Sequence, residues 1–149
     1  MDISVTAGQG LAIRDRVEQL EMACLEQEQI ECPVAHYFGP GVYIREVSVP
    51  AGTFAIGHRQ KVEHLCMFTK GKVNFVEQDG SVTLLEAPMT FTSPPGRKIG
   101  LVLEDMVWLN IYPTEETDID VLEDLYLDKS AYFLDHQKNK IEFDHKGKE

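Results

Sequence analysis

The chain has 149 residues, of which 43% are hydrophobic and 26% are charged, which predicts one globular domain with a core of its own. The net charge of −11 excludes the usual nucleic-acid-binding protein, which neutralises phosphates with Lys and Arg, and it disfavours an anionic membrane surface. No apolar run approaches the roughly 18 residues of a membrane span, and the N-terminus lacks the pattern of a secretory signal, so we expect a cytoplasmic protein.

The chain begins with a predicted tail and a predicted helix. Residues 1–10 carry no periodic pattern. In residues 11–32, apolar side chains recur close to every 3.6 positions with charged side chains between them, which predicts an amphipathic helix over Ala12–Gln29. Pro33 ends it. We expect this helix to pack on the outside of the domain or on a partner subunit.

From Val42 onward, apolar residues recur every second position, which indicates strands with one buried face. Turns of Gly, Pro and Asp separate short segments that are rich in β-branched and aromatic residues. The predicted strands are Val42–Val49, Thr53–His58, Glu63–Thr69, Lys72–Glu77, Ser81–Leu85, Met89–Thr92, Lys98–Leu103 and Met106–Tyr112. Residues 33–113 are therefore predicted to form an all-β domain, an antiparallel barrel or jelly roll.

A short acidic helix is predicted after the last strand. Pro113 ends the strand, and Thr114 or Thr117 is expected to cap a helix that runs to Tyr126, with acids in its first turn. From residue 135 the chain is polar and alternates in charge, which predicts a frayed tail. Residues 114–149 are thus expected to be an acidic helix and a polar tail.

Three scattered cysteines, Cys24, Cys32 and Cys66, predict free thiols in a reducing compartment. The sequence places no general base beside any of them, so a cysteine nucleophile is not favoured.

Glycines and histidines recur at a characteristic spacing in the middle of the chain. Gly52 is followed by five residues and His58, and His64 is followed by six residues and Gly71. This spacing resembles the first motif of the cupin family, in which a glycine, a His-x-His pair, an acid and a second glycine follow one another. Gln60 stands where the second histidine would be, and His64 stands where the acid would be. The resemblance implies a cupin-like barrel whose metal site has been altered.

The family's second motif has a weaker counterpart. Pro94-Pro95-Gly96 resembles its Pro-x-Gly core, with Ile99 at the position of the histidine ligand and Asn110 near that of the asparagine. A further likeness, to small cupin-type proteins of phages and prophages, rests on residues 41–46 (GVYIRE), 107–108 and 113–114. That likeness implies a protein that sequesters a small molecule in the host cytoplasm.

The resemblance implies a divalent metal on His58 and His64, with Gln60 as a third ligand or behind them. Imidazole ligands suit Fe, Mn, Ni or Zn. A catalytic zinc normally has three good protein ligands, however, and Ile99 cannot bind a metal. The alternative is that both histidines are hydrogen-bonded residues that line the interior.

Strand alternation extends the set of interior residues. If His64 points inward, so do Cys66 and Phe68, because every second side chain of a strand lies on one face. The candidate ligand-binding residues, all on such faces, are His58, Gln60, His64, Arg45, Tyr43, Trp108, Asn110 and Tyr112. They predict a pocket with apolar walls and a few polar groups. The alternative is that the aromatic residues simply fill the barrel.

Basic residues among these positions favour an anionic ligand. Arg45 would bind a carboxylate or phosphate, or else pair with a neighbouring acid. Arg97 and Lys98, on the turn after Pro95-Gly96, would steer an anion inward, or else form a solvated turn.

Three functions fit these observations. The first is a cupin-like barrel that binds a small molecule without strong catalysis. The second is a metal-dependent cupin enzyme of the isomerase or dioxygenase type. The third is a structural or assembly protein whose helices are contact surfaces. A homodimer is expected in each case, because cupins often pair through sheet edges or swapped termini.

Overall fold

The computed structural model describes residues 16, 19–23, 32–77, 79–131 and 133–134. The chain divides into two compact units, one over Ile30–Asp128 and one formed by Met1–Gln29 with Lys129–Glu149. In the second unit, Arg16 and residues 19–23 are helical; the rest of the predicted Ala12–Gln29 helix and both predicted tails lie outside the described residues. No helix in the described part of the chain is long and apolar enough to cross a membrane.

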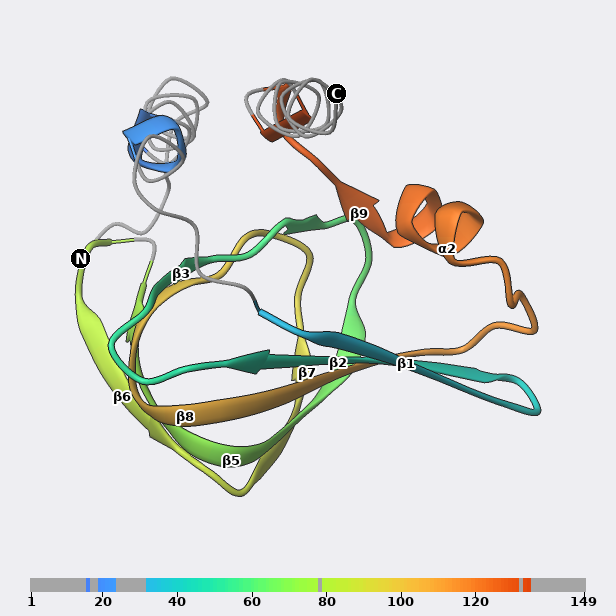
Figure 1. Cartoon of the computed structure of the whole chain (residues 1–149), viewed down its shortest axis with the longest axis horizontal. Coiled ribbons are helices and arrows are strands. Elements are labelled where there is room, and N and C mark those ends of the chain that lie inside the picture. The colour runs from blue at the N-terminus through green and yellow to red at the C-terminus, as the bar shows by residue number, and fades with distance from the viewer. Residues whose placement is uncertain (1–15, 17–18, 24–31, 78, 132, 135–149) are drawn as a thin grey trace, which may run out of the picture. The chain divides into compact units, whose positions relative to one another are not determined.

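The larger unit is built almost wholly from antiparallel strands, which confirms the predicted all-β fold class (Figure 1). Its elements are β1 Val34–Gly39, β2 Val42–Val49, β3 Phe54–Ile56, β4 Arg59–Gln60, β5 His64–Val76, β6 Val82–Glu86, β7 Met89–Ser93, β8 Ile99–Tyr112, helix α2 Ile119–Tyr126 and β9 Leu127–Asp128. Seven strands form one sheet in the order β1-β2-β8-β5-β6, with β3 on β8 and β7 on β5. A second, small sheet pairs β4 with β9.

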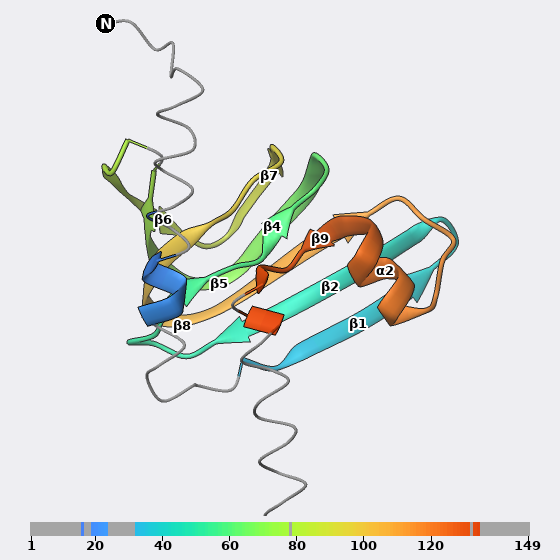
Figure 2. The same ribbon diagram turned by 90° about the horizontal axis from the view of Figure 1, so that it is seen from above.

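The two longest strands, β5 and β8, run through both halves of the large sheet. The first half of β5 pairs with β7 and its second half with β6, while β8 pairs with β3 and then with β2. The register between β5 and β8 shifts between Phe68 and Val73, and such bulges bend a strand. Figure 1 shows β5 and β8 curving around the interior, and Figure 2, seen from above, shows β1 and β2 side by side at one end of the sheet.

Gly71 makes the bend possible. Its φ of +98° is one that side chains rarely adopt, and a Cβ there would lie 2.4 Å from the backbone oxygen of Asp105 on β8. Glycine therefore lets the two long strands approach each other at the point where both turn.

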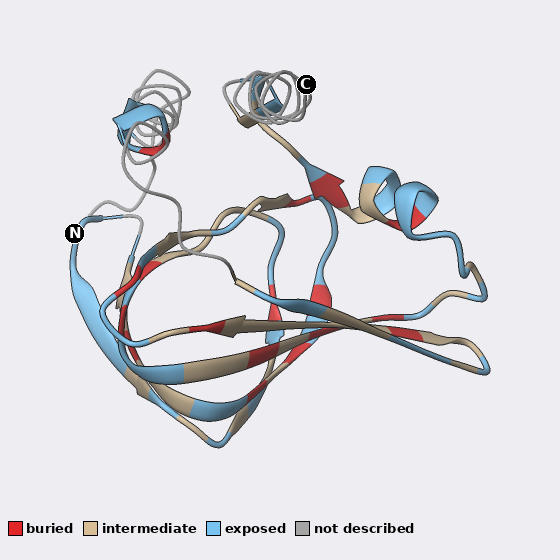
Figure 3. Ribbon diagram, viewed as in Figure 1, coloured by how far each residue is buried: buried red, intermediate tan, exposed pale blue. Residues whose placement is uncertain are grey.

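Three rows of side chains cross the sheet on its interior face, since directly paired residues of antiparallel strands lie on the same face. The first row is apolar and holds Val34, Val47, Trp108, Phe68 and Met89. The second row is largely polar and holds His36, Arg45, Asn110, Cys66 and Phe91. The third row holds Phe38, Tyr43 and Tyr112, and beyond them the pair His64 and Ser93. Figure 3 shows the alternation of buried and less buried positions along these strands.

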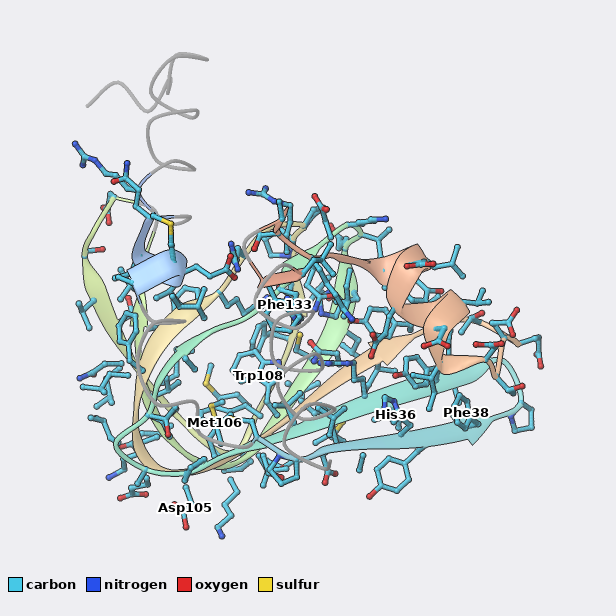
Figure 4. The ribbon with its side chains drawn as sticks, turned by 45° about the horizontal axis from the view of Figure 1, so that its top comes forward. His36, Phe38, Asp105, Met106, Trp108 and Phe133 are labelled. Atoms are coloured by element: carbon cyan, nitrogen blue, oxygen red, sulfur yellow. The ribbon has the colours of Figure 1, made fainter. Side chains whose placement is uncertain are left out.

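The apolar row forms a packed core. Trp108 contacts Phe68 and Phe91, with ring centroids 5.3 and 5.4 Å apart, and Val73 and Val102 are buried in the same cluster. In Figure 4, Trp108 lies among the interior side chains. His36 and Phe38, on β1, lie away from it, toward the end of that strand. This part of the interior is filled, as the packing alternative predicted.

After β8 the chain returns to the barrel through α2 and β9. Asp118 caps α2 by accepting hydrogen bonds from the N–H groups of Asp120 and Val121. Leu122 is buried against Tyr43 and Tyr112, and Tyr126 stacks on Tyr112 with centroids 4.2 Å apart. The return segment thus completes the barrel instead of extending away from it.

Several predicted boundaries differ from the structure. The strands predicted on each side of Gly71 are one strand, β5, and those predicted on each side of Asp105 are also one, β8. Strand β1 was not predicted, and neither were the short strands β4 and β9. The cap of α2 is Asp118, not Thr114 or Thr117. The compact unit that contains the barrel strands spans Ile30–Asp128.

Candidate functional site

Five of the predicted site residues meet in one buried cluster: Tyr43, Gln60, His64, Asn110 and Tyr112. They come from β2, β4, β5 and the C-terminal end of β8. Gln60 reaches the others because Gln60 and Gly96 exchange backbone hydrogen bonds of 2.8 and 3.0 Å, which hold β4 across the barrel. We call these five residues the interior cluster.

His64 is the centre of the hydrogen bonds. Its Nδ1 lies 3.1 Å from the carbonyl oxygen of Val62, which can only accept, so Nδ1 carries a proton. Its Nε2 lies 2.9 Å from Oδ1 of Asn110 and 3.3 Å from Sγ of Cys66. If the imidazole is neutral, Nε2 accepts, either from the thiol or from an Asn110 amide turned the other way. The contacts of Nδ1 and of Nε2 together hold the imidazole ring in one orientation.

Aromatic rings line the next layer. Tyr112 stacks on His64 and on Tyr43, with centroids 5.0 and 5.8 Å apart, and its hydroxyl donates to Oε1 of Gln60 at 2.5 Å. Burial raises the pKa of Tyr112 well above its usual value, so the phenol stays protonated and keeps donating. Tyr43 extends the stack to His36, whose Nδ1 lies 2.6 Å from the Tyr43 hydroxyl.

Arg45 lies in the polar row, directly opposite Asn110. Its Nε is buried and makes no hydrogen bond within the described part of the chain, and no ion pair of Arg45 is found there either. The predicted alternative, a salt bridge to a neighbouring acid, is thus not seen among these residues. Its positive charge lowers the pKa values of the nearby Tyr43 and Tyr112, against the larger effect of burial.

Lys98 was expected on a turn, and its backbone does lie there. The N–H of Gly57 donates to the Lys98 carbonyl at 2.9 Å. Its side chain, however, turns inward, and Nζ donates to Oγ of Ser93, a residue with no exposed surface. Burial lowers the pKa of the Lys98 amine, and only the Cys66 sulfur opposes this.

Cys66 is fully buried between these groups. Its Sγ contacts His64 and lies 3.7 Å from Oδ1 of Asn110. Burial raises the pKa of the Cys66 thiol, and the nearby Lys98 only partly offsets this effect. The thiol therefore acts as a weak hydrogen-bond donor in the cluster.

The donor set does not fit the metal that the family resemblance implied. Among the described residues, no group of three or more His, Cys, Asp or Glu side chains is placed to hold a metal ion. The hydrogen bonds and ring contacts found for His64 are to Val62, Cys66, Asn110 and Tyr112, and none of them is to His58. His58 lies between β3 and β4 and is partly buried.

Of the other predicted site residues, Trp108 belongs to the packed apolar row, and Arg45 lies opposite Asn110 beside the interior cluster. Sequence reasoning missed Ser93 and His36. The alternation of β7 was a usable signal for Ser93, because Met89 and Phe91 point inward and Ser93 continues the series.

No family model matches the sequence, and no curated protein is significantly similar to it. Among solved structures, a cupin domain from Bordetella pertussis is 16% identical with a TM-score of 0.45, over 59% of this chain and 98% of that chain. An RmlC-like cupin family protein from Methanocaldococcus jannaschii is 12% identical with a TM-score of 0.46, over 60% and 85% of the two chains. Ectoine synthase from P. lautus is 11% identical with a TM-score of 0.49, over 70% and 81%.

These likenesses are too distant to carry an argument about function. The fold class therefore rests on the strand pairing of this chain, and the function has to be argued from its own side chains.

Proposed function

We propose that this protein is a cupin-like barrel that binds a small anionic molecule against the interior cluster. Arg45 would bind the negative charge, and the side chains of His64 and Asn110 would orient the molecule. The observation that carries the proposal is the buried Nε of Arg45, which has no hydrogen-bond partner among the described residues.

A buried arginine side chain is expected to have a hydrogen-bond acceptor. Buried polar groups in folded proteins are nearly always hydrogen-bonded, and a group that is not needs an explanation. A guanidinium presents a planar fork that matches a carboxylate or phosphate, and it keeps its charge. A bound anion would supply the hydrogen bonds that the described part of the protein does not.

The surroundings favour a small and partly aromatic molecule. The rings of Tyr43, Tyr112 and His64 stack on one another beside the polar row, so an apolar wall flanks the position that the molecule would take. Because the chain carries a net charge of −11, its outer surface would repel anions, and binding would depend on local positive charge in the interior.

Binding can be followed with the only tryptophan of the chain, Trp108, which lies in the row next to Arg45 and Asn110. Benzoate, pyruvate and inorganic phosphate would be titrated into the natively purified protein, with fluorescence and melting temperature as readouts. We expect at least one of them to bind saturably and to raise the melting temperature.

Arg45→Met should weaken that binding about tenfold or more, because a hydrogen-bonded charge contributes roughly 1.5–3 kcal/mol. The matched control is Lys70→Met, which removes an equal charge from an exposed position of β5. Arg45→Lys keeps the charge without the fork, and circular dichroism verifies the fold of each variant. Arg45→Met binding as tightly as the wild type, or no anion binding to the wild type, would overturn the proposal.

The metal-dependent enzyme remains the competing function. Elemental analysis of the untagged protein decides between the two: one equivalent of Fe, Mn, Ni or Zn that is lost on changing His58 or His64 would favour it. Sequestration of a host metabolite by a phage-encoded protein and a cytoplasmic location stay predictions.

We also propose that the protein is a homodimer, with β6 as the contact. This strand pairs only with β5, so its other edge carries backbone groups that no described strand uses. Val82 and Leu84 on β6 are more than half exposed, at 59% and 53%. An edge of this kind readily pairs with another chain, and a second copy of β6 related by a two-fold axis would satisfy both edges at once.

A further inference from the structure

Lys98 differs from the other lysines of the barrel unit in where its amine lies. Its backbone is held at the rim, where Gly57 donates to its carbonyl and Nε of Arg97 donates to Gly57 in turn at 2.7 Å. From there the side chain passes inward to Ser93, whose hydroxyl lies 3.3 Å from the carbonyl oxygen of Pro94. With that hydroxyl proton donated to Pro94, the Ser93 oxygen is left to accept from Lys98.

In the part of the chain that the structure describes, no acid pairs with this amine. Within the described residues Lys98 makes no ion pair, whereas Lys72 at the surface lies 3.3 Å from Glu86 and 3.5 Å from Glu104. Printed contacts aside, the strand pairing places Lys98 and Arg45 on either side of His64. Lys98 donates to Ser93, which pairs with His64, and His64 lies 2.9 Å from Asn110, which pairs with Arg45.

The interior thus holds two possible nucleophiles, Cys66 and Lys98. Burial shifts their pKa values in opposite directions, with opposite effects on their reactivity. A low dielectric favours the neutral form of each, raising the pKa of the Cys66 thiol and lowering that of the Lys98 amine. A neutral thiol is a poor nucleophile, because the thiolate is the reactive form. The neutral amine is the reactive form of lysine, and a lowered pKa increases the fraction of Lys98 in that form. The chemistry of this interior thus selects Lys98.

We propose that Lys98 captures the carbonyl group of its ligand as a reversible imine, so that the molecule bound is a small aldehyde or keto acid. This inference rests on the proposed anion binding and names the class of anion. Nζ adds its electron pair to the carbonyl carbon and forms a C–N bond, and the carbonyl oxygen takes up a proton. Loss of that hydroxyl as water leaves a C=N bond.

The step balances without any co-reactant, because both hydrogens of the neutral amine end on the released water. Ser93 would orient the amine through its hydrogen bond, and His64, paired with Ser93 across β5 and β7, would exchange protons with the leaving hydroxyl. The carboxylate of the ligand would be bound by Arg45.

The test is reductive trapping. Glyoxylate or pyruvate is mixed with the native wild-type protein, sodium borohydride reduces any C=N bond, and peptide mapping by mass spectrometry locates the adduct. We expect one main adduct, on Lys98, with at least about tenfold more labelling than on any exposed lysine. Lys98→Gln should abolish it, whereas the control Lys70→Met should leave the adduct on Lys98 in place.

A competition experiment avoids any dependence on how the variants fold. Benzoate has the negative charge and the ring but no ketone or aldehyde, so it should occupy the wild-type barrel and protect Lys98 from trapping by glyoxylate. Labelling spread evenly over surface lysines, or labelling of Lys98 that benzoate does not reduce although it binds, would overturn the imine.

The outcomes separate the two proposals. If benzoate binds in an Arg45-dependent way and neither glyoxylate nor pyruvate is trapped on Lys98, the imine is wrong and the proposed function stands. If no anion binds at all, both fail.

Discussion

Tyr112 is the side chain on which most interior contacts converge. Its ring stacks on Tyr43, His64 and Tyr126, and its hydroxyl donates to Gln60. It lies at the C-terminal end of β8, where the return segment meets the barrel. The residue therefore joins the interior cluster to α2, and its hydroxyl and its ring can be tested separately.

Tyr112→Phe keeps the ring and removes the hydroxyl. The Oε1 atom of the buried Gln60 then loses its partner, so the free energy of unfolding should fall by about 1–2 kcal/mol. Urea denaturation measures this change. Tyr37→Phe, at an exposed position on β1, is the control and should leave the midpoint unchanged. An unchanged midpoint for Tyr112→Phe would mean that water replaces the hydroxyl at no cost.

The same residue predicts how stability changes at alkaline pH. Burial raises the pKa values of Tyr112, Tyr43 and Cys66 in the folded protein. In the unfolded chain a thiol loses its proton near pH 8.5 and a phenol near pH 10, so above these values the unfolded state binds fewer protons than the folded state. Each of these three groups therefore lowers stability as the pH rises above its unfolded value. Lys98 acts in the opposite sense, because burial lowers its pKa in the folded protein, but only up to its unfolded value of about 10.4. The decline should therefore be seen above about pH 10.4.

Denaturation curves between about pH 10.4 and pH 11.5 test this sign. The decline should be shallower in Tyr112→Phe, which has one phenol fewer to ionise on unfolding. A wild-type protein whose stability rises over this range would contradict the burial of these groups.

At the scale of single elements, the bends of β5 and β8 shape the interior. The strands β5 and β8 pair with each other, and each has one further neighbour along its first half and another along its second half. The register shift beside Gly71 turns both strands at one place. Without this bend, the apolar row around Trp108 and the residues Val73 and Val102 would lie on one flat face and could not enclose a core.

Gly71→Ala should destabilise the fold by more than about 2 kcal/mol, because a positive φ costs roughly 1–2 kcal/mol and the new Cβ meets the Asp105 backbone at 2.4 Å. Gly80→Ala is a matched control: its φ is +86°, but no atom lies within 4 Å of the added Cβ. The control should lose only about 1 kcal/mol. Equal losses in urea denaturation would show that steric contact at the bend is unimportant.

The sequence predicted the faces of the strands better than their ends. Alternation correctly placed His64 with Cys66 and Phe68, all of them buried. Gly71 was taken for a strand end because a turn and a bulge both require a positive φ, and the sequence alone does not distinguish them. Ser93 was missed because its role depends on pairing with His64 and on the reach of Lys98, which are contacts between distant segments.

At the scale of the whole molecule, the strand order leaves β6 as one edge of the large sheet. The formal charge of −11 favours separate, soluble chains, whereas the exposed Val82 and Leu84 favour association. Because charge repulsion is screened by salt, the balance between these effects should depend on ionic strength.

We expect the wild-type protein to sediment as a dimer, and increasingly so at higher salt. Leu84→Lys should raise the dissociation constant at least about tenfold, which corresponds to about 1.4 kcal/mol. Thr92→Lys is the control, since Thr92 is exposed on β7 on the other half of the sheet. A strictly monomeric wild-type protein in sedimentation velocity, or a Leu84→Lys variant as dimeric as the wild type, would contradict the β6 contact.

The pairing of β4 with β9 also bears on how the chain folds during synthesis. Arg59 on β4 pairs with Asp128 on β9. Strand β9 is therefore the last part of its compact unit to leave the ribosome. Until then Tyr112 lacks the ring of Tyr126, and Leu122 cannot cover Tyr43. A nascent chain that stalls before residue 119 would expose these aromatic surfaces, and it would be the species most prone to aggregate or to engage a chaperone.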